Sequence, residues 1–102
     1  MATPQLTAEE RTAALEKAKA ARARRAEVRE QVRAGKLTAA QVLDLRYDEV
    51  VGRMKVSTLI ETLPGYGKAK TEQLMEELRI APTRRLRGLG ARQLEALLER
   101  LG

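Results

Sequence analysis

The stretch Leu63-Pro64-Gly65-Tyr66-Gly67-Lys68-Ala69-Lys70-Thr71 decides how the centre of this chain folds. Pro and Gly interrupt the helical pattern, so the stretch is predicted to contain a helix end, a tight turn and a new helix start. The two glycines permit positive φ and a close approach of the backbone to a ligand. The second helix begins with N–H groups that have no partner inside the helix, and a phosphate fits at such an end.

Two cations, Lys68 and Lys70, stand in the first turn of the predicted helix, where they oppose the helix dipole. A bound phosphate would remove that conflict. The spacing matches the helix-hairpin-helix pattern, in which such a turn holds a DNA phosphate without reading bases. The alternative is a plain tight turn between antiparallel helices, because short Gly-x-Gly patterns are weak signals on their own. The candidate binding residues in the segment 63–70 are Leu63, Pro64, Gly65, Tyr66, Gly67, Lys68 and Lys70.

A second basic turn lies at Arg84-Arg85-Leu86-Arg87-Gly88-Leu89-Gly90-Ala91-Arg92. We expect a short helix from Pro82 to about Arg87, with two leucines anchoring the segment to the core. No acidic residue lies between Glu77 and Glu95, so the arginines have no local counter-charge. Arginine is the bidentate phosphate donor among side chains. The candidate binding residues in the segment 81–93 are Arg84, Arg85, Arg87, Gly88, Gly90 and Arg92, the alternative being a solvated charged face.

Two further cations, Arg53 and Lys55, flank Met54. They are possible additional contacts that line the same surface, or two ordinary exposed cations.

The N-terminal third predicts one long helix over residues 7–34, rich in Ala, Arg, Glu and Lys. Thr7 and Glu10 form a predicted capping box, and Gly35 ends the helix. Val28 and Val32 share a face, but large apolar residues are otherwise sparse. A row of arginines on this helix is either a solvated face or a second DNA contact.

Shorter helical segments follow, with five to seven helices in all, so the predicted class is all-α: a long N-terminal helix plus a compact helical domain. Thr38 with Gln41 predicts a capping box, Asp48 caps a short segment, and Ser57 is expected to cap the helix before Leu63. The later helices are predicted at 68–78 and 91–101. We expect residues 1–36 to be a basic helix or arm and residues 37–102 to be the domain, because 23 of the 28 large apolar residues lie in 36–102.

Composition excludes several kinds of site. The 102 residues include no Cys, His, Trp or Phe, which rules out disulfides, thiolate or histidine metal sites and a Ser-His-Asp triad. We expect no metal and no cofactor. A net charge of +6 points to nucleic acid or another anionic surface. No apolar run approaches a membrane span, and the start lacks a signal-peptide pattern, so a cytoplasmic protein is expected. A lysine nucleophile acting on DNA would need a carboxylate partner that the motifs lack.

Taken together, the motifs resemble the actinobacterial integration host factor family. The resemblance rests on three runs, Gly52 to Ser57, Leu63 to Lys68 and Arg84 to Gly90, and on the Leu6 to Arg11 opening. That family is similar to the helix-two-turns-helix domain of a small-subunit ribosomal protein. The departure from the family pattern is Tyr66, where a small aliphatic residue is expected.

The resemblance implies a nucleoid-associated protein that binds double-stranded DNA with little sequence preference, bends or compacts it, affects its topology and assists phage integrase. It also implies that the helix-two-turns-helix element, here 63–70, contacts the backbone near the minor groove, with a lid-like element, here 81–93, as a second contact. We expect a free monomer without enzymatic activity. The alternatives are an RNA- or ribosome-associated protein, a protein–protein adaptor, or a DNA lyase relative.

Overall fold

The structure, a computed structural model, describes residues 7–101 and confirms the all-α prediction. Leu6 of the expected opening lies outside this range. The α-helices are α1 (Ala8–Arg33), α2 (Ala39–Asp44), α3 (Val56–Thr62), α4 (Lys68–Glu77) and α5 (Ala91–Leu101). Two short 3-10 helices, η1 (Val51–Arg53) and η2 (Leu86–Gly88), lie in the connections. Within residues 7–101 no helix has the length and apolar character that a membrane span requires.

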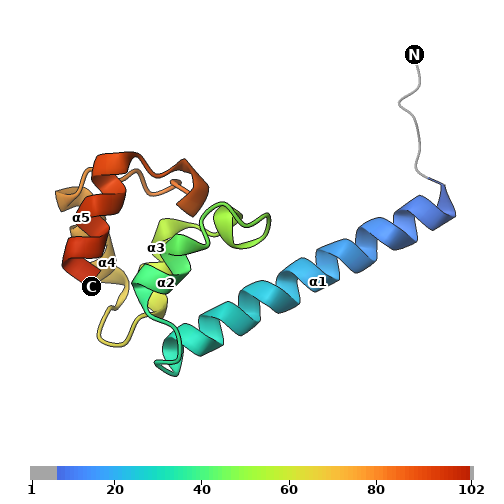
Figure 1. The fold of residues 1–102 in the computed structure, drawn as a ribbon, viewed down its shortest axis with the longest axis horizontal. Coiled ribbons are helices and arrows are strands. Elements are labelled where there is room, and N and C mark those ends of the chain that lie inside the picture. Colours follow the sequence, from blue (N-terminus) through green and yellow to red (C-terminus); the bar gives the residue numbers. More distant parts are fainter. Residues whose placement is uncertain (1–6, 102) are drawn as a thin grey trace, which may run out of the picture.

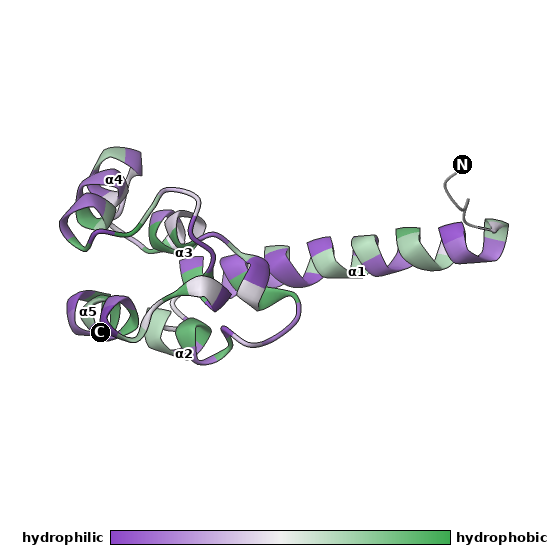
Figure 2. Cartoon of the chain, turned by 90° about the horizontal axis from the view of Figure 1, so that it is seen from above, coloured by the Kyte–Doolittle hydropathy of each residue, from purple (hydrophilic) through white to green (hydrophobic). Residues whose placement is uncertain are grey.

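The helices of the compact part form two layers, with α1 projecting from one side (Figure 1). Helices α3 and α4 make one layer and α2 and α5 the other (Figure 2), and the helices of each pair contact each other. The side chains between the layers form one apolar core, with Leu43, Leu59, Ile60, Leu86 and Leu97 almost entirely buried. Burial of such side chains is the main favourable term in folding a domain of this size.

Helix α1 belongs to the core only near its C-terminal end. Val28 and Val32 are buried there, as their shared face predicts, whereas every residue from 7 to 20 is exposed. Thr7 caps the helix by accepting the N–H of Glu10 at 3.0 Å. Gly35 ends it with a φ of 77°, in the left-handed conformation that favours glycine.

The connections between helices follow the predicted local signals in two places. Thr38 and Gln41 form the expected capping box at the start of α2. Asp48 accepts the N–H groups of Val50 and Val51, both at 2.9 Å, as predicted for a short capped segment.

Two boundary predictions are wrong. Ser57 does not cap α3: the N-cap is Lys55, and Ser57 is already inside the helix. The reason is tertiary, because the N–H of Val56 donates to the carbonyl of Arg84 and so fixes the helix start. The helix predicted from Pro82 is also absent, and only Leu86–Gly88 is helical, as a 3-10 turn. The N–H of Leu86 donates to the carbonyl of Met54, which holds the preceding residues extended.

Candidate nucleic-acid interface

The turn between α3 and α4 has the predicted form, but its two glycines act differently. Gly65 has a φ of 87°, whereas Gly67 has a φ of −89° and is the N-cap of α4. No side chain caps α4, and a Cβ atom built on Gly67 would meet nothing within 4 Å. The absence of a side chain at Gly67 therefore leaves the first N–H groups of α4 open to an approaching anion.

Both cations of this turn are exposed, and one of them lies over an aromatic ring. Lys68 and Lys70 are both exposed, and no ion pair among residues 7–101 involves either of them. The Lys70 ammonium lies 4.8 Å from the centre of the Tyr66 ring. Tyr66 is half-buried against the core, so it holds Lys70 beside the helix start. Leu63 is half-buried and Pro64 exposed at the other end of the turn.

The second basic segment is joined to Arg53 and Lys55 by backbone hydrogen bonds. Lys55 and Arg85 form an isolated antiparallel bridge, and a guanidinium N–H of Arg85 donates to the carbonyl of Arg53. A hollow of about 590 Å³ lies over this junction. The residues that line it include four arginines, Arg53, Arg84, Arg85 and Arg87, and two glycines, Gly52 and Gly88. We call this surface the arginine hollow.

Three of the predicted arginines are each held by a main-chain oxygen. Arg84 donates to the carbonyl of Gly88 at 3.1 Å and Arg87 to that of Tyr47 at 3.1 Å, while Arg85 is bonded to Arg53. None of the ion pairs within residues 7–101 includes them. A guanidinium has five N–H donors, so each arginine keeps its charge and most of its donors.

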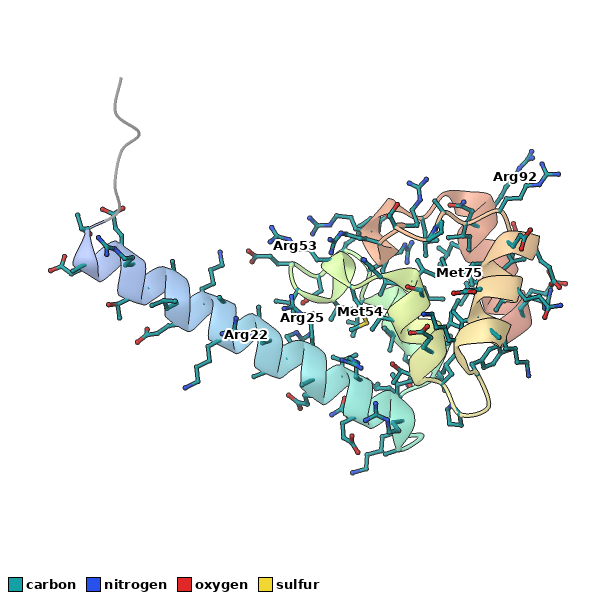
Figure 3. All side chains as sticks on the ribbon, turned by 180° about the vertical axis from the view of Figure 1, so that it is seen from behind. Arg22, Arg25, Arg53, Met54, Met75 and Arg92 are labelled. Carbon is teal, nitrogen blue, oxygen red and sulfur yellow. The ribbon has the colours of Figure 1, made fainter. Side chains whose placement is uncertain are left out.

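Gly90 and Arg92 do not line the arginine hollow. The N–H of Gly90 donates to the side-chain oxygen of Gln93 at 3.0 Å, so the backbone donor that precedes α5 is bonded within the chain. Arg92 projects away from the body near the start of α5 and lies well apart from Arg53 (Figure 3). The two glycine turns therefore differ, since the N–H of the residue before α5 is bonded within the chain, whereas Gly67 is the N-cap of α4 without a side-chain cap.

The turn and the arginine hollow lie at opposite ends of α3, because Lys55 is its N-cap and Leu63 its C-cap. A helix of 7 residues is about 10 Å long. That length corresponds to about three base pairs of duplex at about 3.4 Å per step. The two surfaces are therefore separated along α3 by about the length of three base-pair steps.

Two residues that shape the arginine hollow, Gly52 and Asp48, were not among the predicted site residues. Gly52 is buried, and a Cβ atom there would collide with the carbonyl oxygen of Arg46. Asp48 holds the loop that leads to Gly52. The N–H groups of Val51 and Val50, and then Arg24 at 3.4 Å, keep the pKa of Asp48 below its ordinary value of 3.8. The capping role of Asp48 could be predicted from the sequence. The need for glycine at position 52 could not, because its close contact is with the carbonyl of Arg46, which is not a neighbour in the sequence.

Comparison with known proteins gives a consistent result. Residues 32–101 match the family model described as the S13-like H2TH (helix-two-turns-helix) domain. Over its full length the chain is 59% identical to the integration host factor of Mycobacterium tuberculosis, covering 98% of that protein. It is 47% identical to the integration host factor of Streptomyces coelicolor, covering 100% of this chain and 96% of that protein.

Among solved structures, this chain resembles sIHF bound to an 8-bp palindromic DNA, with a TM-score of 0.81 and 43% sequence identity. The match covers 85% of this chain and 99% of the sIHF chain. The resemblance expected from the three motif runs is thereby confirmed. The chain belongs to the integration host factor family with an S13-like H2TH domain.

Proposed function

We propose that this chain binds double-stranded DNA, largely without sequence preference, and bends or compacts it. The observation that carries the proposal is the arginine hollow: three arginines positioned by main-chain oxygens and without carboxylate partners among residues 7–101. A polyanion supplies the missing counter-charge. The structure of sIHF bound to an 8-bp palindromic DNA supports DNA as the partner.

Each surface has a distinct role in the proposal. The N–H groups at Gly67 and the cation of Lys68 hold one phosphate, with Lys70 placed by Tyr66. The arginine hollow, with Arg53 and Lys55, holds a neighbouring stretch of backbone, and Arg92 adds an outer contact. Contacts of this kind position the protein without carrying sequence information. Two contacts separated by α3 favour bending of one duplex.

The wider role rests on membership of the integration host factor family. We place the protein in the cytoplasm on the nucleoid, as a monomer when free, with effects on DNA topology and on phage integrase complexes. Residues 37–102 form the binding domain, and residues 1–36 are an accessory helix or arm. The function is binding rather than catalysis, and borohydride trapping of a lysine adduct on abasic DNA would overturn that statement.

The direct test is binding to a duplex of about 30 base pairs across a salt series, with Arg85→Glu and Arg87→Glu compared with the wild type. We expect at least about a tenfold loss of affinity, and a salt slope lower by about 0.9 for each lost phosphate contact. Lys36→Glu is the control, because Lys36 is exposed and lies outside both surfaces, yet it changes the charge equally. Thermal unfolding of each variant verifies folding.

Two results would contradict the proposal. Weak binding of the wild type at low salt would remove DNA as the partner, and equal losses in Lys36→Glu and Arg85→Glu would reduce the effect to net charge. Competition with duplex RNA completes the test, because a clear preference for RNA would favour the ribosome-associated alternative.

A further inference from the structure

We propose that helix α1 holds a further stretch of the DNA backbone, next to the stretch held by the arginine hollow. The contact surface is a hollow between α1 and the segment 49–53, which we call the α1 groove. The inference rests on the proposed function and adds to it a contact on α1, which neither the turn before α4 nor the arginine hollow includes.

The α1 groove has a volume of about 550 Å³ and runs along the helix. Its lining on α1 extends from Ala14 to Arg25, and the facing segment contributes Glu49, Val50 and Arg53. The part of α1 from Ala14 to Arg25 rises about 16 Å, which corresponds to about five base-pair steps of a duplex. The groove is therefore long enough to follow several successive phosphates.

The charge of the α1 groove is positive and only partly neutralised. Its charged lining residues are one carboxylate, Glu49, and four cations, Lys17, Arg24, Arg25 and Arg53. Lys17 pairs with Glu49 at 3.1 Å and Arg24 pairs with Asp48 at 3.4 Å. Arg25 and Arg53 take part in no ion pair within residues 7–101, so the groove lacks a counter-charge for two guanidinium groups.

The position of Arg25 is fixed by the packing of α1. Arg25 precedes Val28 by three residues and Val32 by seven, so it shares a face of the helix with these two buried side chains. Arg25 itself is half-buried, and Figure 3 shows it where α1 passes the loop that carries Arg53. Two unpaired guanidinium groups that line one hollow repel each other, and a bound phosphate would offset that repulsion.

Arg53 connects the two hollows. It lines the arginine hollow together with Arg85 and Arg87, and it lines the α1 groove together with Arg25. A duplex backbone that leaves the arginine hollow past Arg53 therefore reaches Arg25 next. Arg22 and Arg29 stand three residues before and four residues after Arg25, and neither takes part in an ion pair within residues 7–101. They extend the row of cations along the helix.

The apolar part of the α1 groove favours a row of phosphates over a protein partner. It consists of alanine side chains and Val50, which offer little apolar area to bury. Protein interfaces draw most of their binding energy from large side chains in well-packed pockets. Cations spaced along the helix and continuous with the arginine hollow match a nucleic-acid backbone instead.

The first test removes one charge at a time from α1. Arg25→Gln is compared with Lys19→Gln on a duplex of about 30 base pairs across a salt series. Lys19 is the matched control, because it is exposed, lies outside the groove and stands six residues from Arg25, on a different side of the helix. Arg25→Gln should lower the affinity several-fold and the salt slope by about 0.9, the value for one phosphate contact, whereas Lys19→Gln should keep the slope of the wild type.

The second test leaves the charge unchanged and uses the absence of cysteine from the chain. Ala18→Cys places a single thiol in the α1 groove, and Ala23→Cys places one five residues further on, on a different side of the same helix. The probe is a set of duplexes, each with a disulfide-activated tether on one phosphate. Ala18→Cys should form the covalent adduct by thiol–disulfide exchange much faster than Ala23→Cys. Thermal unfolding of all four variants verifies folding.

Equal adduct rates of Ala18→Cys and Ala23→Cys on a duplex that the wild type binds would overturn the proposal. Equal salt slopes of Arg25→Gln and Lys19→Gln would overturn it as well. The wild type is measured on the same duplexes, so failure of the proposed function is recognised separately, as absence of wild-type binding at low salt.

Discussion

Arg79 ends helix α4 with a φ of 56°, the left-handed conformation that costs energy for any residue with a Cβ atom. The N–H of Ile80 donates to the carbonyl of Met75 at 2.8 Å and that of Arg79 to Glu76 at 3.1 Å. These two bonds form a Schellman motif, in which the residue at this position is usually glycine. The motif turns the chain so that Ile80 is buried beneath the loop that leads to the arginine hollow.

Arg79→Gly should therefore raise the free energy of unfolding by about 0.5 kcal/mol, since the relief of strain exceeds the entropy cost of glycine. Urea denaturation measures the change. Gly35→Arg is the inverse control at the end of α1: its φ is 77°, and a Cβ atom there meets nothing within 4 Å. The Gly35→Arg variant should lower the free energy of unfolding by about 1 kcal/mol through the backbone conformation alone. A destabilised Arg79→Gly would show that the arginine side chain contributes more than its backbone costs.

Helix α4 begins without a side-chain cap, and this start is the feature of the element that matters most for the proposed function. A serine at the N-cap would accept an N–H of the first turn, which is the same group that the proposal assigns to a phosphate. Stability and binding therefore oppose each other at Gly67, as is common where a functional site is left unsatisfied.

Gly67→Ser should raise the free energy of unfolding by a few tenths of a kcal/mol and weaken duplex binding several-fold. Denaturation and a binding titration on the same preparations measure both effects. Ala69→Ser, which adds a hydroxyl inside the first turn but not at the cap, should leave the affinity close to that of the wild type. Unchanged affinity of Gly67→Ser would remove the α4 start from the interface.

At the scale of the whole molecule, α1 is divided between core and solvent. Val32 is 1% exposed and Leu15 is 67% exposed on the same helix. Only the C-terminal part of α1 therefore adds to the stability of the domain, and the rest is a projecting arm (Figure 1). Its attachment by two largely exposed ion pairs is weak, because such pairs are each worth about 1 kcal/mol or less.

Val32→Ala should lower the free energy of unfolding by about 2 kcal/mol, because it removes buried methyl groups and leaves a cavity. Leu15→Ala should change it by less than about 0.5 kcal/mol. Thermal and denaturant unfolding of the two variants compare them directly. A large loss in Leu15→Ala would mean that the arm packs on its own domain.

Helix caps and helix ends were predicted correctly where the hydrogen-bond partner of the capping residue lies within a few residues in the sequence. The caps at Thr7, Thr38 and Asp48 and the glycine at Gly35 were predictable because each is satisfied by a neighbour in the chain. The roles of the two glycines before α4 were not separable, since a Gly-x-Gly pattern does not state which glycine has positive φ. The proposed binding roles of the site residues remain predictions until the variants are measured.

The sequence by itself determined the all-α class, the caps of α1 and α2 and the two basic turns, because helix propensity, capping and charge act over one or two turns of chain. Only the tertiary structure decided that Arg53 and Lys55 join the arginines, and that α3 starts at Lys55 rather than at Ser57. Both depend on backbone hydrogen bonds between segments about 30 residues apart, which burial of Leu86 and Met54 in one core brings together. No local pattern reports such a pairing, because its partners become neighbours only when the chain has folded.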